Sequence, residues 1–360
     1  MRMKLVVAAW GEPTDEKVWS KTPSILVKML QERGVNVSTF NLRQFENLFM
    51  RFFSLLFRKI FRLRIMTRSC IVRYYYQHKF DAFVHNNKGK KILYIAEHCS
   101  KRPYPDVEQY VYMDSVLRPY YIYDEQTSDF AKNQLSSYEK IDRKSLASMN
   151  KIFTQNQWTK DFIVKEYGIN KDKVLNIHFG VNLKPLMSKK DYSKNLLLIV
   201  LRKGTERLKG LNLLLEAFPL VRKSCPTAEL AVVGTIGPEI EGVQYYYNQP
   251  RETTVELFAK CTLYTMPALF EPNGITYLEA LANKTPIVGL NRFAFPEFAG
   301  YGQYGFIVDN ADKHSLSQTI IKALSDKHNL EVMGIKGQEY VLSNFSWDKT
   351  ISSIIDNIND

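Results

Sequence analysis

The 360-residue sequence has few cysteines and no long apolar segment. Its four cysteines lie far apart and form no C-x-x-C pair. This argues against a disulfide framework or a zinc site and favours reduced thiols in a cytoplasmic protein. No stretch of about 18 uncharged apolar residues occurs, so we predict no transmembrane helix. The apolar run that begins at Lys4 is too short for a signal-peptide core and indicates a first buried strand.

Two common nucleotide-binding motifs are also missing. No lysine follows a glycine run in the manner of a P-loop, so phosphoryl transfer has no support. The letters G-x-G-x-x-G do occur at 300–305, but they precede a predicted strand instead of joining a strand to a helix. That context excludes a dinucleotide phosphate loop.

What the chain has in excess is positive charge, with a formal net charge of +12. Much of it lies in the segment 45–79, where eight basic residues and one acid alternate with aromatic and aliphatic residues. One interpretation is a core-packing helix with a solvated basic face. The other is a helix that lies on an anionic membrane surface. We do not expect nucleic acid as a partner, because no recognised nucleic-acid motif accompanies the charge.

Short apolar runs alternate with helical patterns along the chain, which predicts parallel sheets covered by helices. In the first half we expect strands at 4–9, 35–40, 80–85, 91–97, 109–113, 151–154 and 173–178. In the second half we expect strands at 196–201, 229–233, 243–247, 263–266, 287–290 and 306–308. Asn156 is typical of a helix N-cap, and Gly168 of the residue that ends the same helix.

These patterns indicate an α/β protein with two domains. We expect an N-terminal domain at 1–183, a polar linker at 184–195 and a second domain at 196–345. A last helix at 346–360 is expected to pack back on the first domain. Each domain would be a Rossmann-like, doubly wound parallel sheet. Two such sheets facing each other form a cleft at the carboxyl ends of their strands, where ligands bind in these folds.

The most specific segment runs from Glu271 to Glu279, with a Pro-Asn-Gly turn that opens a helix between the two glutamates. The free amides of Asn273, Gly274 and Ile275 suit a phosphate or a sugar hydroxyl. Glu279 lies about one turn further in, where a carboxylate can accept two ribose hydroxyls. Eight helical residues rise roughly 12 Å, which fits a glycosidase carboxylate pair poorly. The alternative is a helix whose acidic N-terminus is stabilised by the helix dipole.

A basic loop directly follows the predicted strand at 196–201 and carries Arg202, Arg207 and Lys209. A departing diphosphate gains negative charge as its bond breaks. Fixed cations at this edge of a sheet would stabilise that transition state more than the ground state. The alternative is a solvated basic loop.

Residues 196–347 resemble the donor domain of glycosyltransferase family 4, whose members are retaining enzymes of GT-B architecture. The resemblance covers the second half of the chain as an ordered set of motifs. These motifs are Arg-Leu-Lys-Gly at 207–210, Leu-Leu-Leu-Glu-Ala-Phe at 213–218, Glu-Leu-Ala-Val-Val-Gly at 229–234, the E-x7-E segment at 271–279, Ala-Asn-Lys-Thr-Pro-Ile-Val at 282–288 and Asn-Phe-Ser-Trp at 344–347.

By this resemblance Glu279 would bind the ribose of a sugar nucleotide and Glu271 the donor sugar. Residues Asn273 to Ile275 would meet the sugar and the distal phosphate, and the basic loop would meet the diphosphate. No D-x-D triplet occurs, which disfavours a metal-chelating glycosyltransferase. We therefore expect no metal and no cofactor, with a nucleoside-diphosphate sugar as co-substrate.

The first half resembles a subgroup of the same family more weakly, through Trp-Ser-Lys-Thr-Pro at 19–23 and Val-Tyr-Met-Asp at 111–114. Many members have a histidine where Asp114 falls, so Asp114 is one candidate for the catalytic role and His98, which ends the preceding predicted strand, is another. Gly11 ends the first strand, where a tight loop could admit the acceptor. The alternative for Asp114 is a helix cap, for His98 a structural histidine, and for Gly11 an ordinary turn glycine.

The resemblance implies a retaining hexosyltransferase that serves cell-surface polysaccharide or glycan synthesis. Its acceptor would be a hydroxyl of a saccharide or lipid-linked saccharide, which attacks from the face that the diphosphate leaves. Two rivals stay open: a sugar-nucleotide epimerase on the same scaffold, and a non-catalytic protein that binds anionic surfaces. We expect a cytoplasmic protein, held peripherally on the inner face of the membrane if 45–79 lies on lipid.

Overall fold

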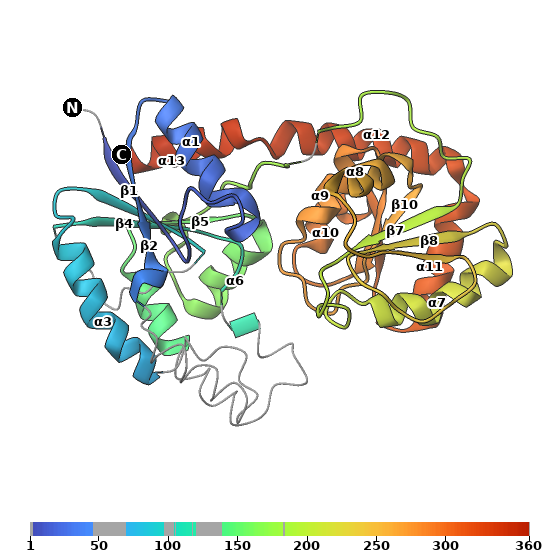
Figure 1. Ribbon diagram of the computed structural model, residues 1–360, viewed down its shortest axis with the longest axis horizontal. Coiled ribbons are helices and arrows are strands. Elements are labelled where there is room, and N and C mark those ends of the chain that lie inside the picture. The colour runs from blue at the N-terminus through green and yellow to red at the C-terminus, as the bar shows by residue number, and fades with distance from the viewer. Residues whose placement is uncertain are drawn as a thin grey trace. The chain divides into compact units, whose positions relative to one another are not determined.

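Strands and helices alternate along the chain in this computed structural model (Figure 1). The structure describes residues 3–45, 70–96, 104, 106–116, 118–119, 139–182 and 184–359. The chain divides into two units by its internal contacts. Unit 1 is Met1–His178 with Trp347–Asp360, and unit 2 is Phe179–Ser346.

Unit 1 contains a six-stranded sheet in the order β2-β1-β3-β4-β5-β6, and every pairing in it is parallel. Its central strands are buried on both faces, as their apolar sequences predict. The strands are β1 (Lys4–Ala9), β2 (Asn36–Asn41), β3 (Lys91–Ile95), β4 (Glu108–Met113), β5 (Lys151–Thr154) and β6 (Val174–Asn176).

The described helices of unit 1 mostly connect these strands. Helices α1 (Thr22–Glu32), α3 (Cys70–His85) and α6 (Gln157–Tyr167) lie between strands, as does a helical stretch at 139–147, whereas α13 (Trp347–Asn359) ends the chain; short 3-10 turns lie at Trp19–Lys21, Leu42–Phe45 and Lys171–Lys173. Helix α6 begins as predicted, because the Asn156 side chain accepts a hydrogen bond from the Thr159 amide at 2.8 Å. Gly168 ends it with a φ of 65°, in the left-handed region.

One predicted strand is wrong. The segment Phe80 to His85 is the last part of helix α3 and not a strand. Phe80, Phe83 and Val84 are buried there, a spacing of three and four residues that matches one face of a helix. A strand would bury every second residue. Short apolar runs fit both patterns, and here the helical face packs on the core.

The basic segment 45–79 falls largely outside the described residues. Phe45 lies at its start and belongs to the core, where its ring is 5.2 Å from that of Phe80. Lys79 lies near its end and is exposed on α3. Among the helices that the structure describes, none is both long enough and apolar enough to cross a bilayer.

The last helix of the chain, α13, packs on α1 within unit 1. The Arg33 guanidinium donates to Asp348 Oδ1 at 2.8 Å and to Ser352 Oγ at 2.6 Å. Further along, the Lys91 ammonium donates to the carbonyl of Ile358. A buried isoleucine face completes the attachment.

Unit 2 also contains a six-stranded parallel sheet, in the order β12-β11-β10-β7-β8-β9. Its strands are β7 (Leu196–Val200), β8 (Glu229–Val233), β9 (Val243–Tyr246), β10 (Leu263–Thr265), β11 (Ile287–Leu290) and β12 (Gly305–Val308). The chain runs outward from β7 through β8 to β9, then returns to the other side of β7 with β10 and continues outward through β11 to β12. This reversal is the doubly wound pattern. Together the two sheets confirm the predicted α/β class with two Rossmann-like halves.

Helices cover both faces of the unit 2 sheet. They are α7 (Leu211–Ser224), α8 (Arg251–Lys260), α9 (Ile275–Ala282), α10 (Phe295–Phe298), α11 (Lys313–Ser325) and α12 (Lys327–Asn344), with a 3-10 turn at Gly300–Gly302. Figure 1 shows α7 and α11 on one side of the sheet and α8 and α9 on the other. This division follows from right-handed crossovers that run in opposite directions from β7 and β10.

The segment that we expected as a polar linker, 184–195, is part of unit 2 by its contacts. Lys190 is only 4% exposed, and its ammonium donates to the carbonyls of Phe258, Ala259 and Asn283 at 2.9–3.1 Å. A fourth hydrogen bond, of 2.7 Å, reaches Thr285 Oγ1. The lysine therefore binds the carboxyl ends of α8 and α9 together. The segment 184–195 has the polar sequence of a linker. The partners that bury Lys190 are remote in sequence, so the sequence alone does not reveal them.

We expect Lys190→Met to lower the free energy of unfolding by about 2–4 kcal/mol, because buried carbonyls at two helix ends lose their only charged donor. Burial lowers the pKa of Lys190, yet four short hydrogen bonds keep its amine in place. Urea unfolding measures the change. Lys189→Met is the matched control, since Lys189 is exposed, and it should change stability by less than about 0.5 kcal/mol. Equal stabilities for the two variants would contradict the role of Lys190.

Candidate functional site

Two loops of unit 2 meet where β7 and β10 end. These strands are neighbours in a parallel sheet, so the loops after them leave the same edge. The loop after β7 carries the basic run at 201–210, and the loop after β10 leads into the E-x7-E segment. The amide of Phe270 donates to the carbonyl of Leu208 at 3.0 Å, which joins the two loops directly.

Gly210 sets how closely these loops approach. Its φ is 74°, and a Cβ at this position would lie 1.9 Å from the carbonyl oxygen of Pro267. Only glycine fits both the backbone conformation and the contact. Because Lys209 directly precedes this glycine, the approach carries the lysine toward the second loop.

The ammonium of Lys209 forms an ion pair with the carboxylate of Glu271. Both side chains are mostly buried, at 22% and 16% exposed. The other carboxylate oxygen accepts hydrogen bonds from the amides of Gly274, at 3.0 Å, and Asn273, at 3.4 Å. Glu271 therefore links the Lys209 ammonium to the amides just before α9. The structure thus brings together Lys209, Glu271, Asn273 and Gly274, next to Ile275, the first residue of α9.

Two buried tyrosines hold α9 in place beneath this cluster. The Tyr277 hydroxyl donates to the carbonyl of Met266 at 2.6 Å, and the Tyr264 hydroxyl donates to Thr276 Oγ1 at 2.7 Å. Burial raises the pKa of both tyrosines, so both remain neutral donors. The helix start is thus fixed by hydrogen bonds from the core as well as by apolar contacts.

Glu279 lies one turn along α9 from Ile275, on the same side of the helix. Burial raises the pKa of its carboxyl to about 7, and the positive charge of Arg251 opposes this rise. A desolvated carboxyl that titrates near neutrality is common at functional sites. The sequence analysis missed Arg251, whose only signal is its place at the start of α8, just after β9.

The two arginines of the basic loop differ in exposure. Arg202 is exposed, and Arg207 is partly buried. Both lie on the loop that Lys209 ends, so their guanidinium groups can reach a ligand beside the lysine by rotation of long side chains.

A second contact, which the sequence analysis missed, braces the basic loop against the end of β8. Glu206 Oε1 accepts a hydrogen bond of 2.6 Å from the Thr235 hydroxyl, and this bond lowers the pKa of Glu206. Beside it, Gly234 has a φ of 99°, and a Cβ there would lie 1.8 Å from the carbonyl oxygen of Leu201. The signal in the sequence was a glycine directly after a buried strand.

Gly210→Ala is expected to cost about 2–4 kcal/mol of stability and to displace Lys209 from Glu271, because the new methyl group overlaps the Pro267 carbonyl. Gly204→Ala is the matched control in the same loop. Gly204 also has a positive φ, of 88°, but no atom within 4 Å of its added Cβ, so backbone strain of about 1 kcal/mol is its only cost. Thermal or urea unfolding compares them. Equal losses would show that the loop contact contributes nothing.

The candidates in the first half lie in unit 1. Gly11 follows β1 with a φ of 133°, and a Cβ there would lie 2.6 Å from Val18 Cγ2. Asp114 follows β4, is partly buried, and its carbonyl accepts hydrogen bonds from the side chains of Asn156 and Thr159 at 3.3 and 2.7 Å. Both residues therefore lie at the carboxyl edge of the unit 1 sheet. His98 falls outside the described residues.

The cluster in unit 2 combines groups that suit a ligand with a diphosphate and two sugar rings. Lys209 and the backbone amides at the start of α9, which already hold the Glu271 carboxylate, favour negative charge. Glu271 and Glu279, on either side of that helix start, can accept hydrogen bonds from hydroxyl groups. The ion pair balances the charge of Lys209 against that of Glu271.

Comparison with known proteins is consistent with this chemistry. Residues 187–340 match the family model of glycosyl transferases group 1. A GDP-mannose-dependent alpha-(1-6)-phosphatidylinositol monomannoside mannosyltransferase of Mycolicibacterium smegmatis is 28% identical over 159 residues, which are 39% of this chain and 41% of that protein. A glycogen synthase of Bacillus anthracis is 32% identical over 117 residues, 31% of this chain and 24% of the synthase. The chain thus spans less than half the length of the curated relatives it matches.

Among solved structures, sucrose-phosphate synthase of Thermosynechococcus elongatus aligns with a TM-score of 0.72 at 14% identity, over 99% of this chain and 98% of that one. This likeness shows the fold, two Rossmann-like units of the GT-B class. The family match covers the residues that carry the basic loop, the E-x7-E segment and their ion pair. Residues 187–340 of this chain are therefore similar to the glycosyl transferases group 1.

Proposed function

We propose that the protein is a retaining glycosyltransferase that moves a sugar from a nucleoside-diphosphate sugar to a hydroxyl of a saccharide or lipid-linked saccharide. The observation that carries the proposal is the ion pair of Lys209 with Glu271, whose other carboxylate oxygen accepts hydrogen bonds from the amides that precede α9. It places the basic loop and the E-x7-E segment at one point of unit 2. Each was a separate motif in the sequence.

In this proposal the donor replaces the internal ion pair. The diphosphate takes the charge of Lys209, assisted by Arg207 or Arg202, and the distal phosphate meets the amides at the start of α9. Glu271 is released to bind hydroxyls of the donor sugar. Glu279, which is partly buried, binds the ribose.

The acceptor hydroxyl attacks the anomeric carbon from the face that the diphosphate leaves. The new carbon–oxygen bond forms as the bond to the diphosphate breaks, and an oxygen of the leaving phosphate takes the acceptor proton. The protein contributes positioning and stabilisation of the growing negative charge. In this proposal the side-chain cations stabilise that negative charge, so no metal is required. The sugar nucleotide is a co-substrate.

We place the acceptor on unit 1, near Gly11 and Asp114, with Asp114 or His98 assisting the reaction. Support for a lipid-linked acceptor comes from the Mycolicibacterium relative, whose name describes transfer to a phosphatidylinositol monomannoside. Such an acceptor fits polysaccharide or glycan synthesis by a cytoplasmic enzyme that lies peripherally on a membrane.

Product analysis tests the proposal. The purified chain is incubated with sugar nucleotides and a soluble acceptor analogue, and the products are identified by chromatography and by NMR of the anomeric proton. We expect free nucleoside diphosphate and a new glycoside with the anomeric configuration of the donor. An isomeric sugar nucleotide without free diphosphate indicates the epimerase, and a failure to bind any sugar nucleotide indicates the non-catalytic binding protein.

The membrane part of the proposal rests on the sequence of 45–79. Each lysine or arginine near an anionic surface contributes about 1 kcal/mol, and salt screens the effect. We expect the change of Arg51, Arg58, Lys59 and Arg62 to glutamine to release the protein from anionic vesicles in cosedimentation, while transfer to a soluble acceptor survives. Equal binding of the unchanged protein to neutral and anionic vesicles, or to neither, would leave 45–79 as core packing.

A further inference from the structure

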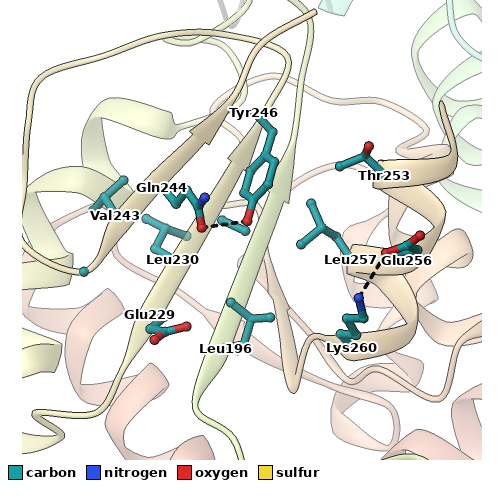
Figure 2. Close-up of a pocket in the computed structure, with 12 residues that line it drawn as sticks. Leu196, Glu229, Leu230, Val243, Gln244, Tyr246, Thr253, Glu256, Leu257 and Lys260 are labelled. Carbon is teal, nitrogen blue, oxygen red and sulfur yellow. Dashed lines mark hydrogen bonds and ion pairs between the residues drawn. The ribbon is translucent and has the colours of Figure 1, made fainter. Parts of the chain in front are cut away.

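A pocket of about 410 Å³ lies on the unit 2 sheet, beneath helix α8 (Figure 2). One side is formed by strands β7, β8 and β9, and the other by a single face of α8. The lining residues are Leu196, Glu229, Leu230, Ala231, Gly242, Val243, Gln244, Tyr246, Thr253, Glu256, Leu257 and Lys260. Its volume lies in the range of small-molecule sites.

The pocket exists because α8 leaves part of the sheet uncovered. The helix contacts β7, whereas β9 is the edge strand and lies two strands away. The strand register pairs Ala231 with Gln244, so both side chains point to the same face of the sheet. Alanine is too small to fill the space between α8 and the edge strand, and a hollow remains.

The pocket is separate from the candidate donor site in the same unit. On β7 and β8 it is lined by the first residues, Leu196 and Glu229, and on β9 it extends from Val243 to the last residue, Tyr246. The basic loop and the E-x7-E segment instead follow the last residues of β7 and β10. In a parallel sheet these are opposite edges.

The charges around the pocket disfavour an anionic ligand. Glu229 and Glu256 are carboxylates at the exposed rim, and the one lysine, Lys260, is 3.0 Å from Glu256 and neutralised by it. The titratable lining groups therefore leave one net negative charge. The lining thus offers a nucleotide or phosphate no cation besides the paired Lys260, whereas the loop that carries Lys209 also carries Arg202 and Arg207.

The remaining lining suits a neutral polyhydroxylated ring. The hydroxyl of Tyr246 donates to Gln244 Oε1 at 2.7 Å, and Figure 2 shows both side chains on the strand side of the pocket, opposite Thr253 and Leu257 of α8. An aromatic ring and a leucine offer apolar surface to the C–H face of a pyranose. The amide, the hydroxyls and the carboxylates offer partners to its hydroxyl groups.

We propose that this pocket is a second saccharide-binding site, which takes one or two neutral sugar rings and acts without the donor. It binds glycan away from the reacting hydroxyl and so raises the local concentration of a saccharide chain at the protein. The inference goes beyond the proposed transfer reaction, because binding in the pocket needs neither a sugar nucleotide nor turnover.

Saturation-transfer NMR tests the site, with methyl α-D-glucopyranoside, methyl α-D-mannopyranoside and maltotriose as probes. Thr253→Trp fills the pocket from the partly exposed face of α8. Thr254→Trp places the same side chain at the neighbouring partly exposed position, which does not line the pocket. Tyr246→Ala removes the ring, and Tyr246→Phe keeps it. A Glu271→Gln variant, the donor-site variant, changes the carboxylate that the proposed function assigns to the donor sugar.

We expect at least one probe to bind the unchanged protein, the Thr254→Trp variant and the donor-site variant. Binding should weaken at least about tenfold in Thr253→Trp and Tyr246→Ala, with a smaller loss in Tyr246→Phe, and should not depend on salt. The proposal is overturned if no probe binds, if the two tryptophan variants bind equally, or if only the donor-site variant loses binding. Binding of these neutral probes that high salt abolishes would show that the neutral lining of the pocket does not hold them, and would also overturn the proposal.

Discussion

Replacing Lys209 with alanine is expected to lower turnover about 10²–10³-fold, the usual loss when one preorganised group that stabilises transition-state charge is removed. The leaving diphosphate is more negative in the transition state than in the bound donor. The loss should therefore fall on turnover more than on donor affinity. Adding Arg207→Ala should deepen it, because a second cation of the same loop is then missing.

Steady-state kinetics together with calorimetry of donor binding separate these two quantities. Lys203→Ala is the matched control, because Lys203 lies exposed on the same loop, 5.1 Å from the centre of the Tyr247 ring. It should keep near-normal turnover. If the Arg207, Lys209 double variant also keeps near-normal turnover, the diphosphate binds elsewhere and the assignment of the basic loop is wrong.

Glu279→Gln is expected to weaken donor binding about 10–100-fold, since a charged hydrogen bond to the ribose is worth about 1.5–3 kcal/mol. The amide keeps the shape of the side chain and removes its charge. Titration calorimetry at pH 8 measures the change. Unchanged affinity in a folded variant would reject the ribose contact.

The raised pKa of Glu279 adds a pH dependence with a definite sign. In the folded protein without ligand the carboxyl keeps its proton up to about pH 7, whereas its ordinary value is 4.5. Between these values the folded state binds more protons than the unfolded state, so stability falls as pH rises through this window. Donor affinity should rise with pH as the carboxylate forms.

The same substitution should therefore stabilise the ligand-free protein at pH 8 while it weakens donor binding. The gain is expected to be on the order of 1–3 kcal/mol, because glutamine has no charge to desolvate. Thermal unfolding at pH 5 and pH 8 shows whether the difference between variant and unchanged protein grows with pH. A constant difference would show that Glu279 titrates normally.

Much of the fold was readable from the sequence, because most of its strands are short apolar runs with polar turns at both ends. β1, β5, β8 and β11 begin and end where the pattern predicted. The exception, Phe80 to His85, is a run in which alternating and helical spacings overlap, so only the tertiary packing decides between them.

The E-x7-E segment was readable for a different reason. Its helix, its N-terminal amides and both carboxylates are contiguous in the chain, so local structure alone positions them. The pairing of Lys209 with Glu271 joins two loops that are far apart in sequence and follows only from the strand order. The raised pKa of Glu279 likewise depends on burial by distant residues.

Tertiary contacts also explain what the sequence did not predict. Lys190 resembles any lysine in a polar connector, and only the folded chain brings the ends of α8 and α9 to it. Glu206 and Thr235 belong to loops after different strands and meet only because β7 and β8 are neighbours.

The central claim is that unit 2 binds a nucleoside-diphosphate sugar between the basic loop and the start of α9. A thermal-shift screen of the unchanged protein against a panel of sugar nucleotides tests it most directly, because a ligand that binds only the folded state raises the unfolding temperature. The account predicts that at least one sugar nucleotide does so, and that Lys209→Ala and Glu279→Gln reduce the shift while Lys203→Ala does not. No shift with any sugar nucleotide, or a shift that both site variants retain in full, would contradict it.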